Sequence, residues 1–159
     1  NDKKDGNSIN LDNRDSNGQN LLHIAAYEGI FEVVKEIIEL KNVFKPSLLN
    51  EKDNENHTPL HFAAYSGNVD IINSFLAFTI PGSKDSLDVD AKGMEDETPL
   101  HWASENGFLD VVKLLCEKGK ADVNLIDKNG NTPKQRAEMQ NQAAVVDYFN
   151  QLGNGNIDA

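Results

Sequence analysis

Thr58-Pro59-Leu60-His61 and Thr98-Pro99-Leu100-His101 decide the fold, because the same four residues recur 40 positions apart. A looser copy, Asn20-Leu21-Leu22-His23, precedes them, and a degraded copy, Thr132-Pro133-Lys134-Gln135, follows them. The successive spacings from Asn20 are 38, 40 and 34 residues. A motif repeated at intervals in this range is typical of repeat proteins. We therefore expect four similar structural units.

Each copy follows a four-residue turn pattern. The last position of the pattern is Gly, Asn, Asp and Gly in the four units, and these residue types adopt a positive φ at least cost. A tight hairpin is therefore expected before each motif. The turn segments are Asp15-Ser16-Asn17-Gly18, Asp53-Asn54-Glu55-Asn56, Gly93-Met94-Glu95-Asp96 and Asp127-Lys128-Asn129-Gly130.

The motif itself predicts the start of a helix. Its Thr, replaced by Asn20 in the first unit, can accept backbone N–H bonds as an N-cap, and its Pro fits the first helical position. The helix should end two turns later, at Gly29, Gly67, Gly107 and Asn141. A second helix then follows with an apolar face. Those faces are Val33, Val34, Ile37 and Ile38; Ile71, Ile72, Phe75 and Leu76; and Val111, Val112, Leu114 and Leu115.

This arrangement resembles the ankyrin repeat from roughly Asp12 to Leu152. The resemblance implies an all-α repeat solenoid in which each unit has two antiparallel helices and a projecting β-hairpin, stacked with a slight curve. We divide the chain into an N-terminal tail or partial cap, a repeat domain and a C-terminal tail. The boundaries are 1–11, 12–152 (repeats at about 15–49, 53–90, 93–126 and 127–152) and 153–159.

The ends and the connections depart from this pattern. The polar first helix of unit four predicts a terminal cap that meets water. At the other end, either Ile9 and Leu11 fold over the first unit or a preceding repeat is missing. Two insertions, 41–50 and 78–90, favour ordinary solvent loops. The alternatives are a longer second helix or exposed fingers, of which the second could contact a partner through Phe78, Ile80 and Leu87.

Composition excludes several function classes. With 15 basic and 26 acidic residues the net charge is -11, which opposes binding to nucleic acid or to an anionic membrane. The single cysteine, Cys116, indicates a reducing compartment. The N-terminal residues lack the apolar stretch of a signal peptide, and no window suits a membrane span. We expect a soluble monomer in the cytoplasm or nucleus.

No chemical site is predicted. His23, His61 and His101 recur at one repeat position, but stacked units would hold them too far apart for one metal ion. The resemblance instead implies that these imidazoles bond the backbone and the capping residue. Cys116 has no basic activator and suits a buried position. Phosphate-binding glycine loops are absent from the sequence, so we expect no enzyme activity, no metal and no cofactor.

Asp122-Val123-Asn124 looks like the hairpin-closing segment of the family, which an asparaginyl hydroxylase modifies on its Asn. Substrates of that enzyme usually carry Leu eight residues earlier, where this chain has Cys116. The sequence therefore favours an unmodified Asn124, with hydroxylation as the alternative.

In the family, partners meet the concave surface made by hairpin tips and first helices. Carried over by repeat position, the expected partner-binding residues are Arg14, Ser16, Asn17, Gln19, Lys52, Asn54, Glu55, His57, Met94, Glu95, Glu97, Lys128 and Asn129 on the hairpins, and Tyr27, Glu28, Tyr65, Ser66, Trp102, Glu105 and Asn106 on the first helices.

Aromatic side chains are the expected anchors. Tyr27 and Tyr65 hold one position in adjacent units and would line a groove; alternatively, each covers only its own helix. Trp102 is expected mainly to pack between units. The acidic cluster Glu95, Asp96, Glu97 and Glu105 predicts affinity for a basic segment, or is simply solvated.

The chain is therefore predicted to be a protein-interaction module that binds an intracellular protein. The alternative is an inhibitor or an assembly-chaperone-like subunit that blocks an enzyme by docking on it.

Overall fold

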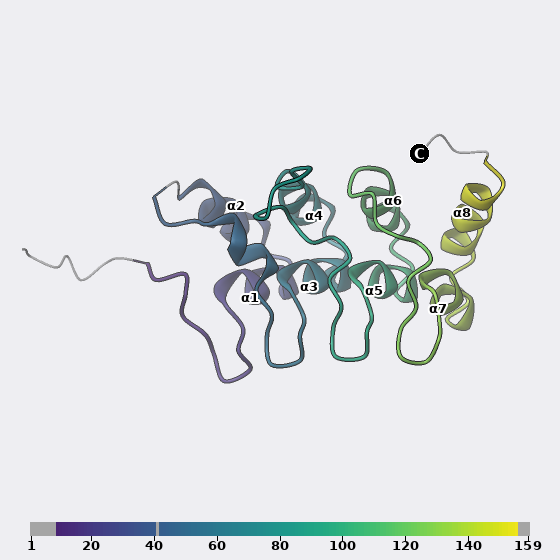
Figure 1. Cartoon of the computed structure of the whole chain (residues 1–159), viewed down its shortest axis with the longest axis horizontal. Helices are drawn as coiled ribbons and strands as arrows, with labels where there is room; N and C mark the ends of the chain where they lie inside the picture. The colour runs from purple at the N-terminus through teal and green to yellow at the C-terminus, as the bar shows by residue number, and fades with distance from the viewer. Residues whose placement is uncertain (1–8, 41, 156–159) are drawn as a thin grey trace, which may run out of the picture.

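The computed structural model describes residues 9–40 and 42–155. Its helices form two rows (Figure 1), with the first helix of each unit in one row, the second helix in the other, and the hairpins projecting beyond the first row. The first helices are α1 (Leu21–Tyr27), α3 (Pro59–Ser66), α5 (Pro99–Glu105) and α7 (Pro133–Met139). The second helices are α2 (Phe31–Glu39), α4 (Val69–Leu76), α6 (Leu109–Glu117) and α8 (Ala143–Gly153), with a short 3₁₀ helix η1 (Pro46–Asn50) after α2. The described part of the chain is thus the all-α repeat stack that the sequence predicts.

Every first helix begins where the motif predicts. Asn20, Thr58, Thr98 and Thr132 adopt extended backbone conformations, and each forms a reciprocal capping box with the third helical residue. Where the motif contains Pro, that Pro is the first helical residue, a position at which its missing N–H costs nothing.

All eight positions expected to have a positive φ do so, with values between 57° and 79°. Four of them close the hairpin turns and four follow the first helices. The turn residues are Gly18, Asn56, Asp96 and Gly130, and the residues after the helices are Gly29, Gly67, Gly107 and Asn141.

Each hairpin turn is closed by two backbone hydrogen bonds of 2.8–3.1 Å. Because these bonds do not continue into a ladder, the hairpins of the described residues contain no extended strand. The outer pairs, N–H donor first, are Asp15–Gln19, Asp53–His57, Gly93–Glu97 and Asp127–Asn131, and the inner pairs are Gly18–Asp15, Asn56–Asp53, Asp96–Gly93 and Gly130–Asp127.

One apolar core runs between the two rows of helices. Leu60 and Leu100 from the motif are fully buried, as are Ile71, Ile72 and Phe75 on α4. The predicted apolar faces are confirmed with small differences: Val33, Ile38 and Leu114 are only partly buried, whereas Cys116 is buried.

The two insertions add to this core, so their prediction as ordinary solvent loops is wrong for several side chains. Leu48 and Leu49 of η1 are buried, and so are Leu87 and Val89 in the second insertion. Phe78 packs on Phe44 of the first insertion, with ring centroids 5.3 Å apart. The alternative of an exposed finger holds only for Ile80, which is 46% exposed. Residue 41 lies outside the described part.

The two ends of the stack differ. Leu11 folds over the first unit and is buried, whereas Ile9 stays exposed together with Leu21, Ile24 and Ile30. At the other end α7 buries only Pro133 and Ala137, as expected of a cap, and α8 covers the core with Val145, Tyr148 and Phe149. Helix α8 runs one residue past the expected domain boundary, to Gly153. The remaining tail residues, 1–8 and 156–159, are outside the described part.

Candidate functional site

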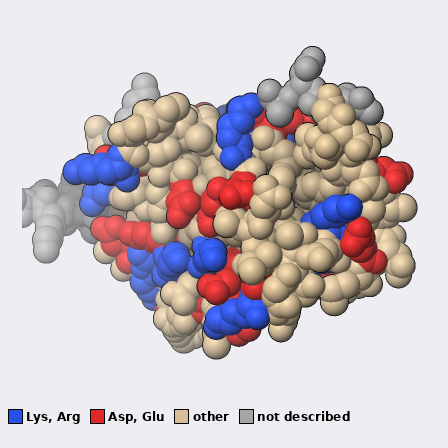
Figure 2. Space-filling model, turned by 45° about the vertical axis from the view of Figure 1, so that its right-hand side comes forward, with Lys and Arg blue, Asp and Glu red and all other residues tan. Residues whose placement is uncertain are grey.

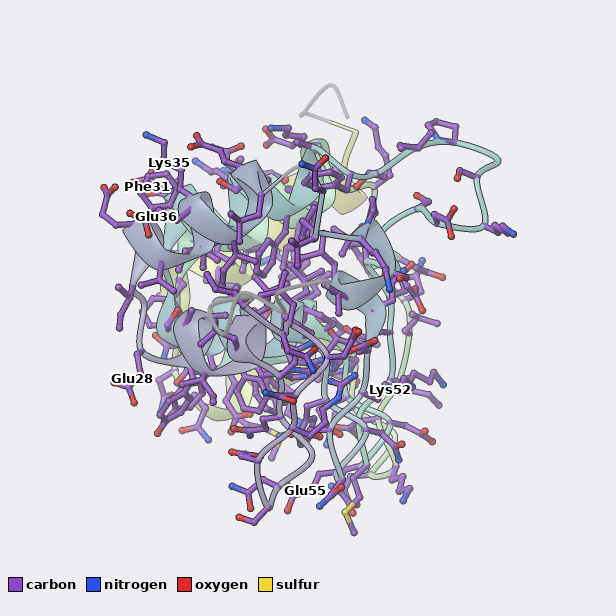
Figure 3. The ribbon with its side chains drawn as sticks, turned by 90° about the vertical axis from the view of Figure 1, so that its left-hand side faces the viewer. Glu28, Phe31, Lys35, Glu36, Lys52 and Glu55 are labelled. Atoms are coloured by element: carbon purple, nitrogen blue, oxygen red, sulfur yellow. The ribbon has the colours of Figure 1, made fainter. Side chains whose placement is uncertain are left out.

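The candidate site is the surface formed by the first helices and the hairpins. Figure 3 looks along the stack from its N-terminal end and shows Glu28 at the end of α1 and Glu55 at a hairpin tip, while α2 carries Phe31 away from both. Lys52 points to the opposite side of the hairpins from Glu28, and its Nζ donates to the carbonyl oxygen of Lys92 at 2.9 Å. Lys52, which was expected at the partner surface, therefore lies on the side of the hairpins opposite to Glu28.

Tyr27 and Tyr65 form the most prominent feature of this surface. Their rings stack nearly parallel, with centroids 5.6 Å apart and planes 8° from parallel. The two tyrosines are 49% and 47% exposed. Each ring therefore rests on its counterpart in the adjacent unit rather than on its own helix alone, and the pair presents aromatic surface to solvent.

Trp102 continues the aromatic row into unit three. Its ring centroid lies 5.9 Å from that of Tyr65, 5.8 Å from that of Phe62 and 4.7 Å from that of His57. The residue is half buried, as expected for a packing role between units. Phe62 is absent from the predicted set, although it occupies the same repeat position as Trp102 and could have been found by that match.

A hollow of about 600 Å³ opens beside these rings, between the first two hairpins. It combines aromatic walls with carboxylate and amide groups. Asp53 is another residue missing from the predicted set. The lining residues are Asn17, Gln19, Asp53, Asn54, Glu55, His57, Phe62 and Trp102.

Asp53 organises the second hairpin. Its Oδ1 accepts the backbone N–H groups of Glu55 and His57, both at 2.9 Å. Its Oδ2 has a single long contact, with Gln19 Nε2 at 3.4 Å. The side chain is 4% exposed, so this carboxylate lies buried at the wall of the hollow.

His57 and Glu97 correct the prediction of two exposed contact residues. His57 Nε2 donates to Glu97 Oε1 at 2.7 Å, and the residues are 7% and 5% exposed. Burial raises the pKa of Glu97, but the hydrogen bond from His57 and the nearby imidazole charge outweigh it, so the pKa lies below its ordinary value. The pair passes over Gly93, which has no side chain to obstruct it.

The repeated imidazoles have the structural role that the resemblance implies. In the second unit, His61 Nδ1 accepts the Thr58 backbone N–H at 3.1 Å, and Nε2 donates to the Glu97 carbonyl at 3.1 Å. Burial lowers the pKa of His61 to about 4. His23 and His101 make the same bonds across the other two unit boundaries, and burial lowers the pKa of each.

Three of the four acidic residues in the cluster of unit three have a partner within the chain. Arg136 Nη1 donates to Glu105 Oε2 at 2.9 Å, Lys128 Nζ lies 3.9 Å from Glu95 Oε1, and His57 pairs with Glu97. Figure 2 shows positive and negative side chains mixed over the face in view. A basic segment that binds this cluster would therefore have to compete with contacts that these carboxylates already make within the chain.

The other predicted residues are distributed along the hairpins and helix ends. Arg14 pairs with Glu51, Ser66 Oγ donates to the Ala63 carbonyl, and Asn54 Nδ2 donates to the Ser16 carbonyl. Glu28, Asn106, Met94 and the fourth-hairpin pair Lys128 and Asn129 are exposed.

The residues considered for modification and chemistry lie apart from this surface. Asn124 is exposed in a turn, where its N–H donates to Asp122 Oδ1 at 2.9 Å. Cys116 is buried, and burial together with the charge of Glu117 raises its pKa to about 12. Within residues 9–40 and 42–155, no His, Cys, Asp or Glu cluster could hold a metal ion, and no helix there is long and apolar enough to cross a membrane.

Comparison with known proteins agrees with this geometry. No curated protein matches the sequence. A family model described as ankyrin repeats (3 copies) matches residues 4–85 and again residues 80–158. These matches cover nearly the whole chain. The capped helix pairs, the turn residues and the stacking of the units agree with the repeats that the model describes. The chain therefore belongs to the ankyrin-repeat family.

Proposed function

We propose that this protein is a non-enzymatic interaction module that binds another protein through the concave surface of its first helices and hairpins. The stacked, half-exposed pair of Tyr27 and Tyr65 carries the proposal. Large aromatic side chains in a partly desolvated groove are the usual anchors of protein interfaces, because they bury much surface at little entropic cost. The family as a whole consists of such modules, which supports the same reading.

Side-chain caps and a hydrogen bond between units hold the helices that carry the two tyrosines. The helices that carry the two tyrosines are capped at Asn20 and Thr58, and His23 Nε2 ties α1 to the second hairpin through the His57 carbonyl at 3.1 Å. Preorganised side chains lose less conformational entropy on binding. The surface that carries the two tyrosines is thus suited to a partner that docks without a large rearrangement of this chain.

An inhibitor or an assembly-chaperone-like subunit would use the same surface, because docking is common to both roles. The difference lies in the bound protein, whose enzymatic activity would fall on docking. A reduced, buried Cys116 fits a cytoplasmic or nuclear site of action.

The test compares three forms of the chain as capture reagents: wild type, Tyr27→Ala with Tyr65→Ala, and Ile80→Ala. Ile80 is a matched control because it is 46% exposed but lies on the second insertion. We expect one set of proteins to bind the wild type and the Ile80 variant and to be lost by the double variant. Equal capture by all three forms would refute the groove as the binding surface.

The purified partner then allows a quantitative measurement. Removing two interface anchors should weaken binding by about 2–4 kcal/mol, or roughly 30-fold to 1000-fold in Kd. Because both rings are half exposed, thermal stability should change little. Calorimetric titration and thermal unfolding of the same samples measure the two effects separately.

A further inference from the structure

We propose that the hollow beside Phe62 and Trp102 receives one arginine side chain of the protein partner, whose guanidinium pairs with Asp53. This inference rests on the proposed function and specifies the chemistry of the partner at one position. Units two and four of the chain differ at this carboxylate.

Unit four shows how a hairpin carboxylate of this kind is satisfied by a guanidinium. Asp127 occupies the repeat position of Asp53, five residues before the capping Thr, and its Oδ1 likewise accepts two hairpin N–H groups. Its Oδ2 accepts from Arg136 Nε at 2.5 Å, and Arg136 also reaches Glu105 at 2.9 Å. Both carboxylates are thereby paired. Burial raises the pKa of Asp127, but the hydrogen bonds from the Asn131 backbone N–H and from Arg136 outweigh it, so the pKa lies below its ordinary value.

Unit two has the same carboxylate without the arginine. The residue four positions after the capping Thr is Arg136 in unit four but Phe62 in unit two. Asp53 Oδ2 is therefore left with only the 3.4 Å contact from Gln19 Nε2, although its side chain is 4% exposed. A buried carboxylate oxygen with one weak donor is poorly satisfied, and a charged donor would relieve that cost.

The walls of the hollow suit a guanidinium rather than an ammonium. Phe62 and Trp102 offer ring surfaces on which the planar group can stack. Glu55, whose Oε2 lies 3.7 Å from His57 Nδ1, adds a second carboxylate with a side chain that is 68% exposed. Arginine stacks on aromatic rings and bonds carboxylates through fixed N–H directions, whereas the lysine ammonium is compact and strongly hydrated. The negative net charge of the chain also favours the approach of a cation.

The experiment is an NMR titration of the full chain with N-acetyl-arginine-N-methylamide and, separately, with the corresponding lysine compound. Arginine should shift the Trp102 indole N–H and the backbone amides of Asn54 and Glu55, and lysine should shift them several-fold less.

The variant Asp53→Asn keeps an oxygen for the two hairpin N–H groups but removes the charge. It should bind arginine about ten-fold more weakly, as expected for losing a charge-assisted hydrogen bond. The control variant Asp85→Asn, which changes an exposed carboxylate in the second insertion, should bind as the wild type does.

A second variant tests the site independently of Asp53. In Phe62→Arg the chain supplies its own guanidinium at the position that Arg136 occupies in unit four, so the hollow should be filled and added arginine should no longer bind.

A folded Phe62→Arg protein that still binds arginine would overturn the proposal. So would the absence of a wild-type response, an equal response to lysine, or full binding by Asp53→Asn. If arginine fails to bind but capture still depends on Tyr27 and Tyr65, the arginine site alone is refuted and the proposed function stands.

Discussion

Gly93 is a residue at which the third hairpin differs from the other three. The other three hairpins carry Asp at this position, namely Asp15, Asp53 and Asp127. A Cβ on residue 93 would lie 2.6 Å from both Glu97 Oε1 and His57 Cδ2. The missing side chain therefore leaves space for the buried bond between His57 and Glu97, which joins the second and third hairpins.

Gly93→Ala should consequently break or lengthen the 2.7 Å bond between His57 and Glu97. Leaving two buried polar groups poorly paired should lower the free energy of unfolding by about 1–3 kcal/mol, measured by urea denaturation. Gly153→Ala is the control, because no atom lies within 4 Å of a Cβ added there. Equal stability of the two variants would contradict this role of Gly93.

The motif leucines should behave as core residues. Leu60→Ala and Leu100→Ala remove fully buried side chains and should each cost about 2–5 kcal/mol. Leu21→Ala, at a position 40% exposed in the first copy of the motif, should cost clearly less. Wild-type thermal stability in Leu60→Ala or Leu100→Ala would show that the repeat register is wrong.

Among the elements, the first helices of units one to three are each tied to the hairpin of the next unit by a neutral imidazole. His23, His61 and His101 donate through Nε2 to hairpin carbonyls at 3.1, 3.1 and 2.9 Å. Their Nδ1 atoms accept the backbone N–H groups of Asn20, Thr58 and Thr98, which requires an unprotonated Nδ1. Protonation would break these bonds and leave only the neighbouring capping oxygen as an acceptor for Nδ1.

Stability should fall in mild acid for this reason. Burial lowers the folded-state pKa of His61 from 6.5 to about 4, so the unfolded chain binds protons first. The contribution of His61 is complete above pH 6.5 and decreases as the pH falls toward 4, by about 3 kcal/mol at 1.36 kcal/mol per unit of pKa. His23 and His101 act in the same direction.

Urea unfolding at intervals between pH 7 and pH 4.5, with NMR titration of the His61 ring, measures this effect. Glu97 and Asp127 have lowered pKa values, so their contributions are lost only at more acidic pH. Stability that stays constant between pH 7 and pH 5, or a His61 ring that titrates near 6.5, would contradict the neutral imidazole tie.

For the whole molecule, the two ends of the stack are held differently. The first unit leaves Leu21, Ile24 and Ile30 exposed, whereas the fourth packs α8 on the core and adds an ion pair from Arg136 to Glu105 of unit three. Arg136 reaches the hairpin of its own unit through Asp127, whose side chain is fully buried. Cooperativity in a repeat stack comes from such contacts between neighbours.

Arg136→Met should therefore loosen unit four before the rest. Removing one partner of a buried ion pair costs about 3–5 kcal/mol, and we expect about 2–3 kcal/mol here because the Arg136 side chain is 20% exposed. Hydrogen exchange should accelerate in α7 and α8, while α3 keeps its protection. Uniform acceleration along the chain would show instead that the stack unfolds as one unit.

Much of this fold could be predicted from local sequence. Turn residues with a positive φ, N-caps and the first-position prolines act within a few residues, so the motif located every helix pair. The tyrosine pair could also be predicted, because equivalent positions of stacked units become neighbours.

The remaining features depend on contacts between distant residues. The bond between His57 and Glu97 joins residues 40 apart in the sequence. It also requires that residue 93, which lies against both side chains, is a glycine. Leu48 and Leu87 are buried only because the insertions fold back on the stack. Asp53 has the sequence context of a turn residue, and the weak pairing of its Oδ2 becomes evident only by comparison with Asp127 and Arg136 of unit four.

Trp102 is the single tryptophan of the chain, and it lines the hollow with His57 4.7 Å from its ring. Its intrinsic fluorescence therefore originates entirely from the boundary between units two and three. Excitation at the red edge of indole absorption avoids the tyrosines, so emission intensity and wavelength report on this boundary alone. The protein thus carries its own optical probe, which allows rapid mixing experiments to follow docking without a dye.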